Sequence, residues 1–196
     1  MPKKSNRDKL VAAGVDVMFK LGYSGAGVRD ITSAAEAPLG SFTNHFRSKE
    51  VFASEVLDRY FAYVKGLMEE SLHNRSLGPV DRIKRYLDIV TSKLEAREWT
   101  LGCLIGNFSL EAPDHSELLR DQLSRIFKEW REPFAECIAE AQAAQEIHSD
   151  FTAEELAEVL LSGWHGAMLR MKVDQSPLPL ERFKKIAFST FLGKGC

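Results

Sequence analysis

Side chains that form hydrogen bonds gather in residues 39–49, which read LGSFTNHFRSK. Ser41, Asn44 and His45 carry hydrogen-bond donors and acceptors suited to phosphate oxygens or to the edges of bases. Gly40 removes a side chain where a protein backbone would approach a duplex. Such a segment adds little to a hydrophobic core, so its composition favours contact with a nucleic acid.

Lys49 is the most informative single residue of this segment. Ser48 fits the N-cap of a following helix, which places Lys49 in the first turn of that helix. The helix dipole favours anions at this end, so a cation is locally misplaced there unless a phosphate docks beside it. We therefore expect Lys49 to contact the DNA backbone.

The elements around this segment predict a helix-turn-helix. Apolar spacing predicts one helix that ends at Gly22, a second over residues 28–35, and a third that begins near Pro38. Pro38 fits a first helical turn, and the turn between the second and third helices is short. The third helix can then enter the major groove while Phe42 and Phe46 hold it to the core.

The charge distribution agrees with a polyanion-binding head. Residues 1–50 hold eight Lys or Arg, Lys3 and Lys4 among them, against five Asp or Glu, a charge of +3. The remaining 146 residues hold 18 against 23, a charge of −5. A basic head on an acidic body suits nucleic-acid binding, although a mildly basic solvated face explains the charge equally well.

The rest of the chain reads as an all-α body. A long helix is expected from Ser48 towards Ser71, and no segment alternates with the period of a strand. Five further helices are predicted over residues 79–97, 103–112, 116–144, 152–173 and 180–192. No apolar run approaches the roughly 20 residues of a membrane span, and the N-terminus lacks the apolar block of a secretion signal, so the cytoplasm is the expected compartment.

Three cysteines, Cys103, Cys137 and Cys196, lie far apart in the sequence. Their spacing suggests neither a zinc site nor a disulfide framework. We expect reduced thiols, no metal and no cofactor.

The stretch GYSGAGVRDITSAAEAPLGSFTNHFRSKEVF resembles the N-terminal domain of the TetR family of one-component transcriptional regulators. The nine-helix layout is similar along nearly the whole chain. Family members usually carry a tyrosine where this chain has Thr43, and commonly Gly-Val where it has Glu36 and Ala37.

The resemblance implies a homodimer that binds a palindromic double-stranded DNA operator, commonly as a repressor, and is released by a small effector. Residues 1–50 are then the DNA-binding domain, residues 48–71 the connecting helix, and residues 72–196 the ligand-binding and dimerisation domain. The residues expected at the DNA are Arg29, Leu39, Gly40, Ser41, Thr43, Asn44, His45 and Lys49.

The last two predicted helices are apolar on more than one side, which indicates a second partner. Over residues 152–173, one stripe contains Leu160 and Trp164 and another contains His165. One stripe packs on the chain's own core, and two require another surface. The expected dimer-interface residues are Leu160, Trp164, Phe183 and Phe191. The alternative is a helix that is completely buried inside a monomer.

An effector site is expected among apolar and aromatic residues of the body. The candidates are Trp99, Cys103, Phe108, Trp130, Phe134, His165 and Met168. Aromatic and methionine side chains at helical spacing more often form a core than a pocket, so the core interpretation stays open for each.

Cys103 raises the hypothesis of covalent sensing. It follows Gly102 at the expected first turn of a helix, where the dipole lowers a thiol pKa and favours the thiolate. The segment GCLIGNFSLE resembles a subgroup of TetR-like regulators with cysteine at this point, some of which respond to electrophiles or oxidants. A small buried apolar cysteine, with a reversible hydrophobic effector, is the alternative.

An enzyme or a helical carrier would be a different class of protein. Cys103 with His165 or His115, or Glu111 with Asp114, could supply catalytic groups. The sequence has no nucleophile elbow, phosphate-binding glycine loop or HExxH motif, so no enzyme is expected. A carrier would explain the helical body but not the polar segment at residues 39–49.

Overall fold

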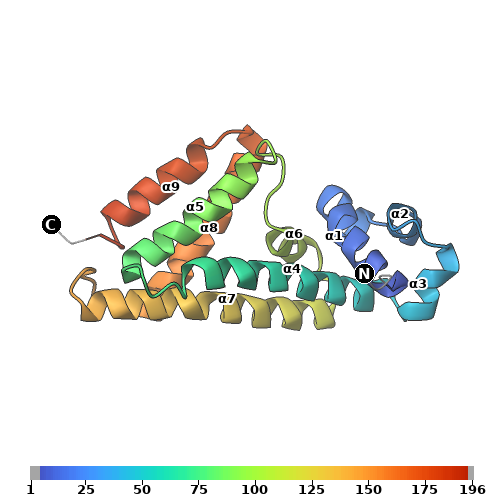
Figure 1. The fold of residues 1–196 in the computed structure, drawn as a ribbon, viewed down its shortest axis with the longest axis horizontal. Helices are drawn as coiled ribbons and strands as arrows, with labels where there is room; N and C mark the ends of the chain where they lie inside the picture. Colours follow the sequence, from blue (N-terminus) through green and yellow to red (C-terminus); the bar gives the residue numbers. More distant parts are fainter. Residues whose placement is uncertain (1–4, 194–196) are drawn as a thin grey trace. The chain divides into compact units, whose positions relative to one another are not determined.

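All regular secondary structure in the described residues, 5–193, is α-helical in a computed structural model of the chain, as the sequence predicts (Figure 1). Lys3, Lys4 and Cys196 lie outside the described residues. The helices are α1 (Asn6–Gly25), α2 (Val28–Ala34), α3 (Leu39–His45), α4 (Lys49–Ser71), α5 (Pro79–Glu95), α6 (Leu104–Glu111), α7 (Glu117–Ala143), α8 (Ala153–Asp174) and α9 (Leu178–Ser189).

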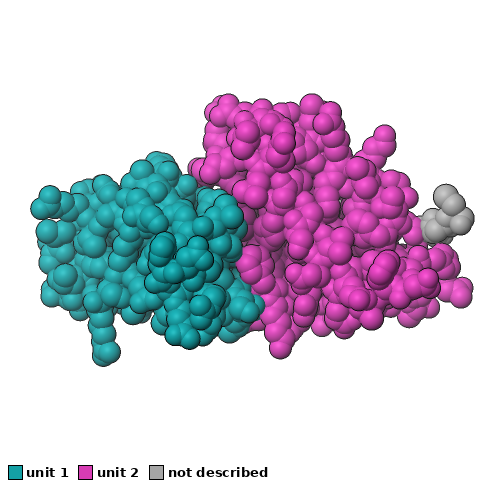
Figure 2. Space-filling view, turned by 180° about the vertical axis from the view of Figure 1, so that it is seen from behind, with its two compact units in different colours: residues 1–63, 104–126 teal, residues 64–103, 127–196 magenta. Residues whose placement is uncertain are grey.

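Two compact units make up the fold (Figure 2). Unit 1 contains residues 1–63 and 104–126, and unit 2 contains residues 64–103 and 127–196. Helix α6 and the start of α7 therefore belong to the same unit as the helix-turn-helix, and α6 packs on α1. The division by function, with DNA binding in residues 1–50, stays a prediction.

Tilted and edge-to-face aromatic contacts anchor α3 within unit 1. The ring of Phe52 lies 5.0 Å from that of Phe42 and 4.8 Å from that of Phe46, and all three side chains are buried. Gly14 of α1 lies against the same ring, because a Cβ there would come within 2.4 Å of Phe52. The sequence expectation that Phe42 and Phe46 hold α3 to the core is confirmed.

Local signals explain where the helices of unit 1 begin and end. Gly22 has a φ of 74°, so regular helical geometry stops there although the chain turns once more to Gly25. Pro38 precedes α3 as its N-cap, and the Ser48 hydroxyl accepts a hydrogen bond from the N–H of Val51 at 3.2 Å. The predicted N-cap at Ser48 is therefore present.

Helices α8 and α9 pack closely in unit 2. A capping box opens α8: Glu155 accepts from the N–H of Thr152 at 2.8 Å, and Thr152 accepts from the N–H of Glu155 at 3.2 Å. A Cβ at Gly163 would lie 2.5 Å from the ring of Phe183, so the glycine permits this approach. Helix α9 begins at Leu178, two residues before the predicted start, because Pro179 fits its first turn.

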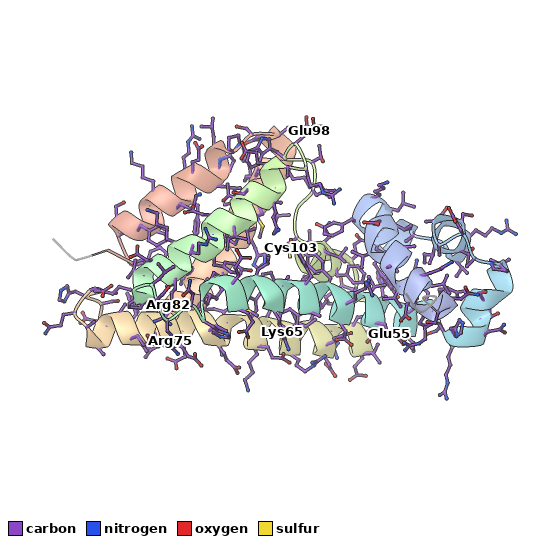
Figure 3. All side chains as sticks on the ribbon, viewed as in Figure 1. Glu55, Lys65, Arg75, Arg82, Glu98 and Cys103 are labelled. Carbon is purple, nitrogen blue, oxygen red and sulfur yellow. The ribbon has the colours of Figure 1, made fainter. Side chains whose placement is uncertain are left out.

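A buried arginine connects three segments of unit 2. Arg82 of α5 donates to the carbonyl oxygen of Leu72 at 3.1 Å and pairs with Glu140 of α7. Arg75 pairs with the same carboxylate from the exposed side (Figure 3). Hydrogen bonds from Arg75 and then Arg82 lower the pKa of Glu140 below its ordinary value of 4.5.

Candidate DNA-binding surface and ligand site

Helix α3 presents a polar face to solvent. Thr43, Asn44 and His45 are exposed, and Ser41 is partly exposed, while Phe42 points into the core. The link from α2 is closed by a hydrogen bond from the N–H of Ala37 to the carbonyl of Thr32 at 2.9 Å. The structure thus brings together the hydrogen-bonding side chains that the sequence singled out.

Gly40 lies where nothing in the described protein requires a glycine. A Cβ at this position would have no atom within 4 Å, and the residue is exposed. Leu39 beside it is 51% exposed, and Arg29 is exposed on α2. A side chain at residue 40 would therefore fit without disturbing the packing of the described residues.

Two of the polar side chains already make hydrogen bonds within the protein. The Thr43 hydroxyl donates to the carbonyl oxygen of Gly40 at 3.1 Å, which leaves its oxygen as an acceptor. The Ser41 hydroxyl accepts from the side-chain amide of Asn6 at 3.5 Å. Asn6 was not selected from the sequence, because nothing in its local pattern indicates a contact with α3.

Lys49 is more constrained than the sequence argument assumes. Its ammonium donates to the carbonyl oxygen of Ser24 at 3.1 Å and lies 5.0 Å from the ring centroid of Tyr23. Partial burial lowers the pKa of Lys49, and the charge of Glu111 opposes that shift. An ammonium has three N–H donors, so a phosphate can still be bound beside these contacts.

An aromatic cluster in unit 2 joins three of the predicted ligand residues. We define it as Tyr86, Phe127, Trp130, Phe134 and His165. The indole N–H of Trp130 donates to the Tyr86 hydroxyl at 2.9 Å, and the ring of Phe134 lies 5.0 Å from that of Tyr86. Tyr86 and Phe127 were missed, although the hydroxyl of a tyrosine on a largely apolar helix face is a signal for such a partner.

His165 has an unusual hydrogen-bonding state. Burial lowers its pKa to about 4, opposed by a hydrogen bond to the backbone of Leu161. Nε2 is inaccessible to solvent and has no partner, so Nδ1 makes the bond to Leu161. At neutral pH the ring is uncharged, with Nε2 as a lone-pair acceptor.

The remaining ligand candidates are not all in this cluster. Phe108 belongs to unit 1, where its ring lies 5.6 Å from that of Tyr23. Trp99 lies in the turn after α5, with a φ of 61°, and Met168 is buried in unit 2. The ligand residues predicted as one site are therefore distributed over both units.

The two described cysteines occupy different surroundings. Cys103 immediately precedes α6 and is 7% exposed (Figure 3). Cys137 lies within α7, 1% exposed, and its thiol donates to the carbonyl of Leu72 at 3.6 Å. Burial raises the pKa of Cys137 to about 11. The thiolate is thus strongly disfavoured at Cys137.

The dimer assignment from sequence needs correction. Leu160 and Trp164 have no exposed surface in the single chain, so they belong to its core and cannot contact a second copy. Phe183 and Phe191 remain partly exposed. The exposed apolar residues of α8 and α9 are instead Val159, Leu169, Val173, Leu178 and Ile186.

Residues 5–193 contain neither a metal-binding cluster nor a membrane-spanning helix. No group of three or more His, Cys, Asp or Glu side chains there is arranged to hold a metal ion. None of the helices in this range has the length and apolarity needed to cross a bilayer.

A short helix with an exposed polar face, anchored in a helix-turn-helix, is typical of DNA-binding transcriptional regulators. Residues 10–56 match the family described as bacterial regulatory proteins, tetR family, and residues 79–187 match the tetracyclin repressor-like C-terminal domain. The chain belongs to the TetR family of transcriptional regulators, which are not enzymes.

Known proteins and solved structures are similar to this chain over nearly its whole length. The chain is 40% identical over 192 residues to the HTH-type transcriptional repressor DhaR of Mycobacterium sp. (strain GP1), covering 98% of this chain and 95% of that protein. A regulatory protein TetR from Rhodobacter sphaeroides has a TM-score of 0.89 at 31% identity, with 94% and 97% of the two chains covered. The reduced form of NemR from E. coli has a TM-score of 0.82 at 26% identity, with 98% and 100% covered.

Proposed function

We propose that this regulator is a repressor that binds a palindromic operator as a homodimer and releases it when a small effector binds unit 2. The observation that carries the proposal is the polar, exposed face of α3, anchored from behind by Phe42 and Phe46. The repressor names of DhaR and NemR support the direction of regulation. Such a protein would act on DNA in the cytoplasm.

Dimerisation would use the exposed apolar side of α8 and α9. Val159, Leu169 and Val173 are exposed on α8, and a Cβ at Gly166 would meet no atom within 4 Å. Open space at a glycine lets a second helix approach closely. A two-fold axis beside these helices would give a four-helix interface.

Two kinds of effector are compatible with this proposal, one that reacts covalently and one that binds reversibly. An electrophile or oxidant would modify Cys103 at the start of α6, and the existence of a reduced form of E. coli NemR supports a redox-sensitive relative. A reversible apolar ligand would instead bind at the aromatic cluster. The reaction of Cys103 separates the two kinds experimentally.

Selection of bound DNA from a random pool tests the proposal directly. The expected result is an enriched inverted repeat, bound by two chains, with half-sites separated by whole helical turns. Asn44→Ala or Ser41→Ala should change the preferred bases, because base contacts rather than phosphate contacts carry specificity. Enrichment of no sequence, or binding of a single chain, would contradict an operator-binding dimer.

A further inference from the structure

His165 contacts two aromatic rings in unit 2. Its ring centroid is 5.0 Å from that of Trp130 and 5.7 Å from that of Phe127, and both contacts are edge-to-face. Phe127 and His165 retain partial exposure as residues, although Nε2 itself is inaccessible. The histidine therefore faces an apolar environment that is not completely closed.

The acceptor on His165 has no donor from the described protein. Nδ1 is bonded to Leu161, so Nε2 carries the lone pair. The ring of Trp130 contacts His165, but its N–H already donates to the Tyr86 hydroxyl at 2.9 Å. Buried polar atoms in native proteins are rarely left without a partner, so this nitrogen calls for an external donor.

We propose that the effector is a small, mainly apolar, uncharged molecule with one hydroxyl group, which donates its proton to Nε2 of His165 while its apolar part packs on Phe127 and Trp130. This inference rests on the proposed effector site in unit 2 and specifies its ligand class. A carboxylate would direct lone pairs at the lone pair of Nε2, and a cation would lose its hydration in an apolar site. A neutral hydroxyl avoids both costs.

Phenol and its methyl ether, anisole, form a matched probe pair, because anisole keeps the ring and lacks the donor. Calorimetry on the full chain should show phenol binding roughly tenfold more tightly than anisole, the size expected for one buried hydrogen bond. The ¹⁵N signal of His165 Nε2 should move toward that of a hydrogen-bonded nitrogen with phenol and stay in place with anisole.

Variants assign the preference to one atom. His165→Phe keeps an aromatic ring, and it should lower phenol affinity to the anisole level without changing anisole affinity. His165→Gln retains an acceptor near the position of Nε2 and should preserve part of the preference, which keeps the test usable if the phenylalanine variant folds poorly. His148→Phe, at an exposed histidine, should have no effect.

Three results would overturn the proposal: no phenol binding, equal affinity for the two probes, or an Nε2 signal already typical of a hydrogen bond without a probe. The last result would show that Nε2 already has a donor in the unliganded protein. Operator binding by the unliganded protein is measured separately. Its loss would contradict the proposed function alone, whereas intact operator binding with no phenol preference would contradict this inference alone.

Discussion

The carboxylate of Glu111 accepts a hydrogen bond from the backbone N–H of Ser24 at 2.8 Å. Lys49 donates to the carbonyl oxygen of the same residue at 3.1 Å, so both polar groups of this peptide segment are held by side chains. Gly22 leaves room for the carboxylate, because a Cβ there would lie 2.4 Å from Oε1 of Glu111. Within unit 1, the last residue of α6 is thus tied to the C-terminal end of α1.

Glu111→Ala should uncouple α6 from the helix-turn-helix. We expect a loss of about 1–2 kcal/mol in unfolding free energy, since a charge-assisted hydrogen bond is removed. Operator affinity without an effector should change little. Benzoquinone, an electrophile that would modify Cys103, should weaken operator binding of the wild type at least about fivefold more than that of the variant, a difference of roughly 1 kcal/mol. Fluorescence anisotropy with labelled operator measures both. Glu95→Ala, at the exposed last residue of α5, is the matched control.

Gly40→Ala should separate DNA binding from folding. The added methyl meets no protein atom, so unfolding free energy should stay constant or rise by up to about 1 kcal/mol. Operator affinity should fall roughly fivefold or more, because overpacking a close interface costs about 1–3 kcal/mol. Gly66→Ala, at an equally open site on α4, should stabilise the protein and leave affinity unchanged. Equal affinities of both variants would remove Gly40 from the DNA surface.

Cys103 should react with benzoquinone faster than Cys137. Burial and a raised pKa of about 11 keep the Cys137 thiol protonated, whereas Cys103 lies at the N-terminal end of α6. Mass spectrometry of labelled peptides gives the two rates, and operator release is followed in parallel. Release should persist in Cys137→Ser and disappear in Cys103→Ser. A full response of Cys103→Ser would favour a reversible effector.

Ile186→Glu should dissociate the proposed dimer without unfolding the chain. The side chain is 59% exposed in the single chain, so a charge is tolerated there until a partner buries it. Burial of an unpaired charge costs roughly 3 kcal/mol or more, about a hundredfold in dimer affinity. Trp164→Glu should instead unfold the chain, because Trp164 has no exposed surface. Light scattering and thermal melting distinguish the two outcomes, and a dimer of folded Ile186→Glu would place the interface elsewhere.

Glu140→Gln should destabilise unit 2 in a pH-dependent manner. We expect the free energy of unfolding to fall by about 2 kcal/mol at pH 7. Breaking a fully buried ion pair costs roughly 3–5 kcal/mol, and the cost is smaller here because the Glu140 side chain is 40% exposed. Its folded pKa is lowered, so the carboxylate contributes stability above the ordinary value of 4.5 and loses it as pH falls through the folded pKa. Denaturant unfolding should show the gap to the wild type closing below pH 4.5.

Two controls separate this effect from others in acid. Arg75→Gln removes only the exposed partner of Glu140 and should have a smaller effect. The pKa of His165 is lowered from 6.5 to about 4, so between these pH values the unfolded chain binds a proton that the folded chain does not. This lowers the stability of the wild type and of Glu140→Gln equally and does not change the gap between them. A constant gap down to pH 3 would show that Glu140 does not act through its charge.

Local patterns in the sequence were sufficient to predict the helices. Gly22 interrupts α1 through its own backbone, and Pro38 and Ser48 cap the first turns of α3 and α4. These helix boundaries were therefore predictable from local sequence. Periodicity likewise identified the apolar stripe of α8 that contains Trp164. It could not show whether that stripe meets the chain's own core or a second copy, since either surface is apolar.

Contacts between distant residues were beyond the sequence. Glu111 and Ser24 are 87 positions apart, and nothing near either residue encodes the other. For the same reason Phe108 was grouped with Trp130, although the fold places them in different units. The unpartnered nitrogen of His165 emerges only once its neighbours are known.

Buried aromatic and exposed polar side chains occupy opposite sides of the seven-residue helix α3. Phe42, with Phe46 just beyond the helix, makes the aromatic contacts to Phe52, whereas Thr43, Asn44 and His45 lie in solvent. Substitutions on the solvent side therefore leave the fold nearly untouched. Under the proposed function, duplicated copies of such a gene would change their operator preference one residue at a time, without passing through unstable intermediates.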